Sequence, residues 1–404
     1  MGAEGGSGRV VAVAIYGSPL AYVSGSGAYL SAVAQGLKAL GCRLHLLMLE
    51  SSGYGHPAPA VLPRYAAPFE TLWASHGPVL SGRAVDLRPG RWFAFAARRA
   101  GLLSPPTRIA RPVDDPSVRR RALARARAVG ADTLMVWRSF PAPLLAEAEG
   151  LRRLYLTDDL HILRRQSFEA AGRAAPFHED IVEAEAAGLV AADACLAIQR
   201  LDMALIRDRV PGTPVFLAPH TCPVGSAPLE QPRPPVALFV GAETPPNTEG
   251  LAWFLREVWP RVRARLPEAR VRVVGAAARR TAEADGVERV GFVEDLGAEY
   301  AAATLAIVPL FIGSGLKIKL VEALAAGLPV VATPVGAQGV EDAPAAALTI
   351  ADDPDGTADA VVARLTSPRA GEERAAARAY AAANFSEAVL RAGLSAALSV
   401  PPRA

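Results

Sequence analysis

Short apolar runs alternate with longer amphipathic stretches along most of this chain, and glycine or proline separates them. Val10–Tyr16 is apolar throughout and predicts a first strand, while the periodicity of residues 27–40, closed by Gly41, predicts a helix. Residues 51–115 are rich in proline and glycine and predict no clear element. Further strands are expected at 43–48, 133–138, 153–157, 194–198 and 215–219, and further helices at 116–129, 141–149, 177–191 and 199–209.

A second series of the same kind follows a proline-rich segment. Pro223–Pro235 contains five prolines and little apolar periodicity, which is typical of a linker. Strands are then expected at 236–240, 271–274, 287–291, 305–310, 330–333 and 347–350, and helices at 248–266, 295–303, 316–326, 356–366, 370–384 and 386–398. Alternating strands and helices indicate parallel sheets covered on both faces. We therefore predict an α/β fold with two Rossmann-like, doubly wound domains that face a central cleft.

The predicted domains span residues 1–225 and 226–385, and a last helix at 386–404 is expected to cross back to the first domain. The chain has 404 residues, 51% of them hydrophobic, which is enough to bury two such cores. Its formal net charge of +3 is too small to predict nucleic-acid binding. Its three cysteines cannot form a disulfide framework and lack metal-ligand spacing.

The uncharged stretch at 10–36 raises the alternative of a signal peptide. Its apolar part is short for that role, and Glu4 offsets the charge of Arg9, so a strand followed by a Gly/Ser-rich turn is the better interpretation. No later run resembles the roughly 20 apolar residues of a membrane-spanning helix. We expect a cytoplasmic protein without a transmembrane segment, and peripheral contact with a membrane stays open.

The most informative stretch follows the strand expected at 305–310. A Gly-Ser-Gly turn at 313–315 precedes the predicted helix, and N–H groups at a helix start bind anions. Lys317 and Lys319, two of only three lysines in the chain, stand at this start, where a cation is unfavourable unless an anion compensates it. The pattern indicates an anion site, and removing Lys317 should then leave the ligand-free stability equal or slightly higher. The alternative is an ordinary strand–turn–helix with solvated lysines.

Glu322 lies on the same predicted helix between apolar neighbours. A carboxylate in such a place needs partners. It could form a surface ion pair with Lys319, three residues earlier, or accept hydrogen bonds from a diol of a ligand. The sequence leaves both interpretations open at this point.

The run from Pro309 to Thr333, with Glu322 followed by Ala-Leu-Ala-Ala-Gly-Leu-Pro-Val-Val-Ala-Thr, resembles the nucleotide-sugar signature of family 4 retaining glycosyltransferases (glycosyltransferase group 1). The resemblance covers most of residues 235–365 and includes Pro246-Asn247-x-x-Gly250. In that family two glutamates, separated by seven residues, bracket the turn and helix start. The second matches Glu322, whereas Ser314 stands in place of the first; a branch with glycine or serine there and two basic residues is similar.

The resemblance implies a glycosyltransferase-B fold and a nucleoside diphosphate sugar donor, bound without a metal and transferred with retention of anomeric configuration. Glu322 would bind the ribose hydroxyls, residues 315–317 the diphosphate, and the strand end at 292–293 the base. The implied donor-binding residues are Asn247, Phe292, Val293, Ser314, Gly315, Leu316, Lys317, Lys319 and Glu322.

The first domain resembles the family more loosely. Gly25, Ser26 and Gly27 open its first helix, where the family has a Gly-rich loop near the donor phosphates and the acceptor; the alternative is a plain N-cap. Asp159 and His161 follow a strand at its carboxyl end, the edge at which open sheets bind ligands. A lone histidine is more often structural, but the family often places an Asp/His pair here. The implied catalytic residues are His161, Asp159 and Lys317.

Together with these residues, the resemblance implies a retaining, metal-independent, hexosyltransferase-like enzyme. Residues 1–225 would bind the acceptor, whether a glycan, a lipid-linked saccharide or a small molecule, and residues 226–385 would bind the donor. No cofactor and no nucleic acid are expected. The alternatives are a catalytically silent nucleotide-sugar-binding protein and an epimerase or phosphorylase on the same fold. Asp353-Pro-Asp355 could suggest a metal site, but its place before a predicted helix favours a helix cap.

Overall fold

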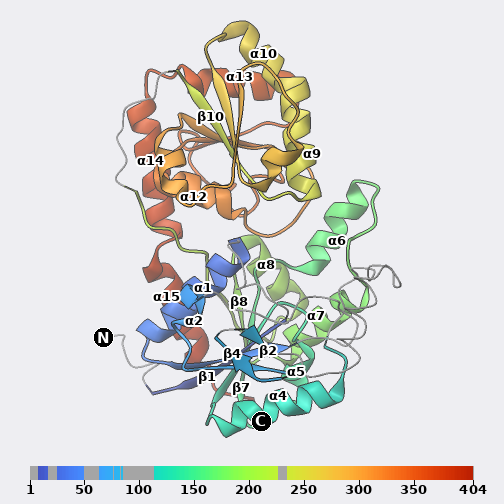
Figure 1. Ribbon diagram of the computed structural model, residues 1–404. Coiled ribbons are helices and arrows are strands. Elements are labelled where there is room, and N and C mark those ends of the chain that lie inside the picture. Colours follow the sequence, from blue (N-terminus) through green and yellow to red (C-terminus); the bar gives the residue numbers. More distant parts are fainter. Residues whose placement is uncertain are drawn as a thin grey trace. The chain divides into compact units, whose positions relative to one another are not determined.

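The computed structural model describes residues 8–16, 25–49, 63–75, 77–81, 83–84, 113–225 and 234–403. The chain forms two compact units: the first comprises Met1–His220 with Ala388–Ala404, and the second comprises Thr221–Glu387. In each unit a parallel sheet lies between helices (Figure 1). The predicted α/β class with two doubly wound domains is confirmed. Residues 226–233 of the proline-rich segment lie outside the described residues.

The first unit is built on a seven-stranded sheet of order β3-β2-β1-β6-β7-β8-β9, in which all neighbours are parallel. The strands are β1 (Val10–Tyr16), β2 (Arg43–Leu49), β3 (Thr71–Ala74), β6 (Thr133–Trp137), β7 (Arg152–Leu156), β8 (Ala194–Ala197) and β9 (Val215–Leu217). The helices are α1 (Gly25–Ala39), α2 (Pro63–Ala66), α4 (Pro116–Ala128), α5 (Pro143–Ala146), α6 (His161–Ala170), α7 (Asp180–Ala191) and α8 (Arg200–Arg209). β4 (Val79–Leu80) and β5 (Arg83–Ala84) form a separate antiparallel pair.

Burial explains which strands the sequence predicts well. Six of the seven residues of β1 and all five of β6 are buried, because helices cover both faces of the sheet. Such strands are continuous apolar runs in the sequence. The edge strand β3 has only one buried residue. This strand lies within residues 51–115, where the sequence predicts no clear element.

Helix α6 is not predicted from the sequence, and its first residue is a candidate site residue. Only His161, Ile162 and Phe168 are buried along its length. Two buried apolar side chains in ten residues are too few to give a clear helical period. Helix α5 is also shorter than the stretch 141–149 that the sequence suggests.

The last helix, α15 (Glu387–Ser399), packs within the first unit. A Cβ built on Gly36 of α1 would lie 2.9 Å from Leu394 Cδ1, and one built on Gly393 would lie 1.9 Å from the carbonyl oxygen of Leu217. Glycine at these two positions lets α15 approach α1 and the end of β9 closely. Beyond the helix, Arg152 Nε donates a hydrogen bond to the carbonyl oxygen of Val400 at 2.6 Å.

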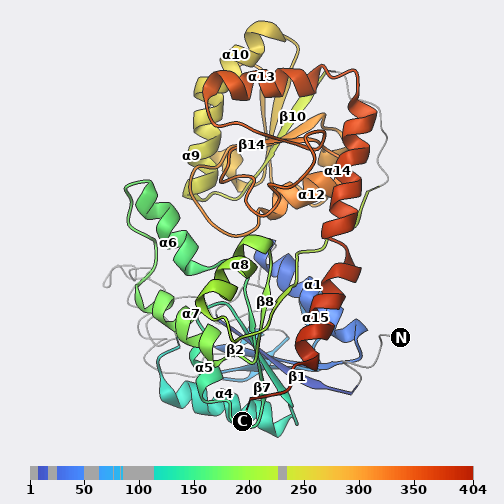
Figure 2. The ribbon, with the colours of Figure 1, turned by 180° about the vertical axis from the view of Figure 1, so that it is seen from behind.

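The second unit has a six-stranded parallel sheet of order β12-β11-β10-β13-β14-β15. Figure 2 shows α9 and α10 on one side of this sheet and α12 and α14 on the other. The strands are β10 (Val236–Val240), β11 (Arg270–Val274), β12 (Val287–Gly291), β13 (Leu305–Val308), β14 (Val330–Ala332) and β15 (Leu348–Ile350). The helices are α9 (Pro245–Trp253), α10 (Trp259–Arg265), α11 (Leu296–Ala301), α12 (Ile318–Ala326), α13 (Pro354–Leu365) and α14 (Ala370–Asn384).

The single helix predicted at 248–266 is divided in the structure. A π-helical turn, Phe254–Val258, separates α9 from α10. Pro260 lies at the start of α10, has no N–H to donate and sterically excludes the carbonyl four residues earlier. The wider π-helical turn accommodates Pro260, so the chain continues as a helix from α9 into α10.

Within the described ranges, no helix has both the length and the apolar character needed to cross a membrane.

Candidate functional site

The carboxyl ends of the second unit's strands form one tightly packed edge. A Cβ on Gly250 of α9 would lie 2.0 Å from the carbonyl oxygen of Pro309, which follows β13. A Cβ on Gly275, which follows β11 with φ of 94°, would lie 2.4 Å from the carbonyl oxygen of Gly241 after β10. Only glycine permits these approaches. At Gly250, α9 therefore packs directly against the segment that leads into the Gly-Ser-Gly turn.

The turn itself requires glycine for its backbone. Gly313 has φ of 131° and Gly315 has φ of 72°, both in the region that side chains rarely adopt. A Cβ on Gly313 would meet no atom within 4 Å, so the constraint there is conformational and does not come from packing. The turn delivers the chain to α12, which ends at Gly327 in the left-handed conformation.

Lys317 is the N-cap of α12, one residue before the helix, and its side chain is 9% exposed. Its Nζ donates to the carbonyl oxygens of Gly315 at 2.7 Å and Ser314 at 3.3 Å, and to Gln338 Oε1 at 3.1 Å. The predicted helix start at 316 is therefore two residues early. The ammonium braces the turn while it brings a positive charge to the helix N-terminus.

Lys319 lies two residues further on, in the first turn of α12, and contacts α9. Its Nζ donates to Asn247 Oδ1 at 2.5 Å and lies 4.8 Å from the centre of the Phe239 ring. The Asn247 amide donates in turn to the carbonyl oxygen of Ala242 and to Thr244 Oγ1, each at 3.0 Å. Asn247 is thus held with its oxygen toward the lysine, and the two predicted residues meet.

Burial dominates the electrostatics of Lys319. Desolvation, and then the charge of Lys317, lower the pKa of Lys319 from 10.5 to about 7, although Glu322 opposes the shift. Two neighbouring lysines at a helix N-terminus disfavour each other's charge. A bound anion would offset both the desolvation of Lys319 and its repulsion by Lys317.

Glu322 lies one turn further along α12 and is half-buried. Its Oε2 accepts a hydrogen bond from Tyr300 Oη at 3.0 Å. Burial raises the pKa of Glu322, although the Tyr300 hydrogen bond and the charge of Lys319 act in the opposite direction. No ion pair between Glu322 and Lys319 forms among the residues that the structure describes, so the surface ion-pair interpretation is not supported.

Two other donor-site candidates stay separate from this cluster. Phe292 and Val293 follow β12, the edge strand of the sheet, and in the described part of the chain no side-chain hydrogen bond or ring contact joins them to α12. The Phe292 side chain is 72% exposed, so its ring face is available for stacking. Leu316 is buried beside the turn.

In the first unit, Arg138 connects two predicted site segments. It follows β6 in the left-handed conformation, with φ of 69°. Its guanidinium donates to Asp158 Oδ1 at 2.5 Å and Oδ2 at 2.6 Å, and to Ser26 Oγ at 2.7 Å. The start of α1, with Gly25 and Gly27 beside Ser26, is therefore tied to the end of β7.

The predicted pair Asp159 and His161 is divided by the structure. Asp159 forms an ion pair with Arg164, whereas His161 Nδ1 lies 2.7 Å from Ser139 Oγ. Both side chains are buried. Arg138 and Ser139 come after a different strand, and no local pattern singles them out in the sequence.

The structure also tests the metal alternative. The Asp353 side chain accepts a hydrogen bond from the Gly356 N–H at 2.7 Å and caps α13, as the sequence favours. In the ranges that the structure describes, no three histidine, cysteine, aspartate or glutamate side chains gather to hold a metal ion.

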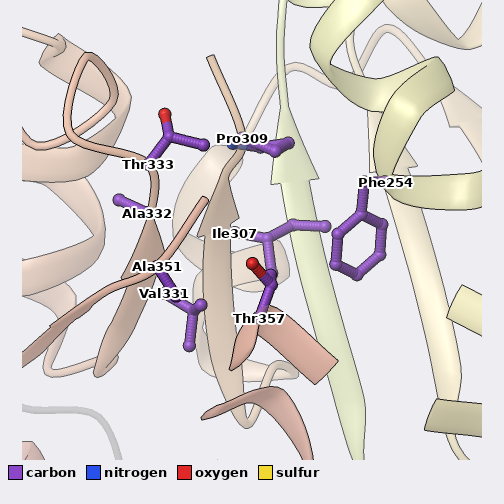
Figure 3. Close-up of a pocket in the computed structure, with 8 residues that line it drawn as sticks. All are labelled: Phe254, Ile307, Pro309, Val331, Ala332, Thr333, Ala351 and Thr357. Carbon is purple, nitrogen blue, oxygen red and sulfur yellow. The ribbon is translucent and has the colours of Figure 1, made fainter. Parts of the chain in front are cut away.

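A small pocket in the second unit is a packing gap. Figure 3 shows Phe254 of the π turn facing Ile307 of β13, with Thr357 of α13 below them. The gap is too narrow for a water molecule and is mostly apolar. We do not consider it a ligand site.

Lys317→Ala is expected to lower the melting temperature of the ligand-free protein, which reverses the expectation from the sequence. The substitution leaves the carbonyls of Ser314 and Gly315 without this donor, and an unsatisfied buried acceptor costs about 1–3 kcal/mol. Gln338→Ala removes only one acceptor and serves as the matched control. Thermal unfolding of the three proteins measures the effect. An unchanged or higher melting temperature for Lys317→Ala would mean that the ammonium does not brace the turn.

Residues 234–367 match the family described as glycosyl transferases group 1. The sequence has no significant match among curated proteins. The family match at residues 234–367 confirms the predicted family resemblance in the second unit.

The solved structures show the fold of the whole chain. Sucrose-phosphate synthase from Thermosynechococcus elongatus has a TM-score of 0.67 at 17% identity, with 96% of this chain and 98% of that chain covered. TarM from S. aureus, solved with UDP, has a TM-score of 0.67 at 8% identity, with 96% and 99% covered. Anabaena HepE in complex with UDP has a TM-score of 0.62 at 13% identity, with 97% and 99% covered. The fold is therefore of the glycosyltransferase-B type.

Proposed function

We propose that the protein transfers a sugar from a nucleoside diphosphate sugar to a hydroxyl acceptor, because residues 234–367 match the family of glycosyl transferases group 1. The transfer retains the anomeric configuration and needs no divalent metal. The second unit binds the donor, and the first unit binds the acceptor near the start of α1 and His161.

One observation carries this proposal. Two of the chain's three lysines, Lys317 and Lys319, stand at the N-terminus of α12, and burial disfavours the charge of Lys319. Within the described residues Lys319 has no carboxylate partner, since its ammonium contacts an amide oxygen and an aromatic ring. A diphosphate would supply the missing negative charge.

The same residues would assist the chemistry. In the transfer, the bond between the anomeric carbon and the β-phosphate oxygen breaks, and the nucleoside diphosphate leaves with the electron pair. The acceptor oxygen forms the new bond with the anomeric carbon, and its proton passes to the departing diphosphate or to solvent. The lysines and the α12 N–H groups stabilise the charge that develops on the leaving group, a task that a metal ion performs in other enzymes.

The other donor contacts follow from the places of the remaining residues. Glu322 accepts hydrogen bonds from the ribose hydroxyls, and the exposed ring of Phe292 stacks on the base. HepE and TarM were solved with UDP, so uridine diphosphate sugars are the first donors to test. A phosphorylase on the same fold would instead require free phosphate and release a sugar phosphate.

A panel of nucleotide sugars, with simple sugars and lipid-linked saccharides as acceptors, tests the proposal through release of nucleoside diphosphate. We expect release that depends on an acceptor and persists in EDTA, and NMR of the product should show the donor's anomeric configuration. Donor binding without release would favour the silent binding protein, for which Ser314 in place of the family glutamate is the supporting feature. Activity that is lost in EDTA and restored by Mg²⁺ or Mn²⁺ would contradict metal independence.

A further inference from the structure

Four buried polar side chains from four separate elements meet in the first unit. Ser139 follows β6, Tyr155 lies on β7, His161 begins α6 and Glu185 lies on α7. Their exposed fractions are 0%, 1%, 4% and 2%, respectively, so their hydrogen bonds are shielded from solvent. We call this set the His161 relay.

Glu185 anchors the relay by replacing a helix cap. The N-cap of α6 is Leu160, whose side chain cannot accept a hydrogen bond. Instead, Glu185 Oε2 accepts from the His161 N–H at 2.8 Å, and Oε1 accepts from the Ile162 N–H at 3.1 Å. An anion at a helix N-terminus is favourable, and both oxygens of this buried carboxylate act as acceptors there.

The hydroxyl of Ser139 transmits this constraint to the imidazole. It has one proton, which it donates to Glu185 Oε2 at 2.8 Å. It accepts from Tyr155 Oη at 3.2 Å. With its only proton committed, Ser139 Oγ must also be the acceptor in its 2.7 Å contact with His161 Nδ1. Nδ1 therefore carries the proton.

We infer that Glu185, acting through Ser139, holds neutral His161 in the Nδ1–H tautomer and leaves the lone pair on Nε2. The opposite tautomer would place the Nδ1 lone pair against an oxygen with no proton to give, and 3.4 Å from the Glu185 carboxylate. Phe140 and Phe177 flank the ring edge-to-face at 5.3 Å and 4.9 Å, which restricts its plane. Ser139 and Glu185 are thus positioning residues.

A fixed lone pair on His161 Nε2 favours ligands that can donate a hydrogen bond to it. It accepts a hydrogen bond from a hydroxyl group, as a sugar donor or acceptor presents, and it is also the form that can take up a proton. This second step rests on the proposed function, whereas the tautomer itself does not.

Nitrogen-15 NMR of the histidine rings tests the tautomer directly. The chain has six histidines, and a His161→Gln variant assigns the signal. Above the titration range of histidine, we expect a protonated Nδ1 and an unprotonated Nε2 in the parent protein. An unprotonated Nδ1 would overturn the inference without any variant.

Three substitutions separate the relay from simple packing. Ser139→Ala should move the population toward the Nε2–H tautomer and lower turnover by up to about 10²-fold, mainly in kcat. Ser139→Thr keeps the hydroxyl and should restore the parent tautomer. Tyr155→Phe removes only the donor to Ser139 and should leave the tautomer unchanged. A tautomer that does not change in Ser139→Ala would contradict the relay.

The tautomer of His161 and the consumption of nucleotide sugars are measured separately. If the parent tautomer is Nδ1–H but no nucleotide sugar is consumed, the relay stands and the proposed function is wrong. If nucleotide sugars are consumed but the tautomer is Nε2–H, the function stands and the relay is wrong.

Discussion

Lys319→Met should lower turnover by about 10²–10³-fold while leaving the ligand-free protein as stable as the parent or more stable. The loss of turnover follows from the loss of the positive charge that Lys319 would carry beside a bound diphosphate. The gain in stability follows from burial, which lowers the pKa of Lys319 from 10.5 to about 7. A methionine of similar length fills the space over the Phe239 ring without a charge to desolvate.

Because burial lowers the pKa of Lys319, the stability of the parent protein should rise with pH. The unfolded chain binds the lysine proton more tightly than the folded chain between about pH 7 and 10.5, so the parent gains stability as pH rises through this window. The destabilising effect is complete below the folded pKa and vanishes near the unfolded pKa. The stability difference between Lys319→Met and the parent should therefore be largest below pH 7 and close toward pH 10.5.

Calorimetry of diphosphate binding gives a second readout. With its pKa lowered to about 7, Lys319 should lose most of its charge near pH 8 in the free protein, and a bound anion should return the proton to it. UDP binding should then take up about one proton, seen as a dependence of the binding enthalpy on the buffer. Lys38→Met is the matched control, since Lys38 is an exposed lysine on α1. Equal proton uptake by Lys319→Met and the parent would place the anion elsewhere.

Glu322→Ala should weaken donor affinity by about 10- to 150-fold for each ribose hydrogen bond that it makes, because bonds to a charged acceptor contribute about 1.5–3 kcal/mol. Burial raises the pKa of Glu322, so its ionised form is disfavoured in the folded chain. The substitution should consequently cost the ligand-free protein little stability at neutral pH. Titration calorimetry with UDP compares the variant with the parent.

Tyr300→Phe is the matched control for this measurement. Tyr300 donates to Glu322 Oε2 at 3.0 Å, and its removal leaves the carboxylate in place. Donor affinity should stay within a few-fold of the parent. If Tyr300→Phe weakens binding as much as Glu322→Ala does, the carboxylate acts by holding Tyr300, and the ribose contact is wrong.

The sequence by itself was sufficient for features that are contiguous along the chain. Val10–Tyr16 has the predicted bounds because a strand buried on both faces is a continuous apolar run. The Gly-Ser-Gly turn, the two lysines and Glu322 lie within one short stretch, so the sequence alone predicts an anion site there. The family resemblance depends on the same stretch.

The tertiary structure decided which side chains meet. Lys317 turns back onto carbonyls of its own turn, and Lys319 finds Asn247 from another helix, because the strand ends of a parallel sheet converge on one edge. The His161 relay joins β6, β7, α6 and α7, which no local pattern connects. Local periodicity in the sequence reports which residues are buried. Hydrogen-bond partners depend instead on how distant segments pack together, and only the folded chain specifies that packing.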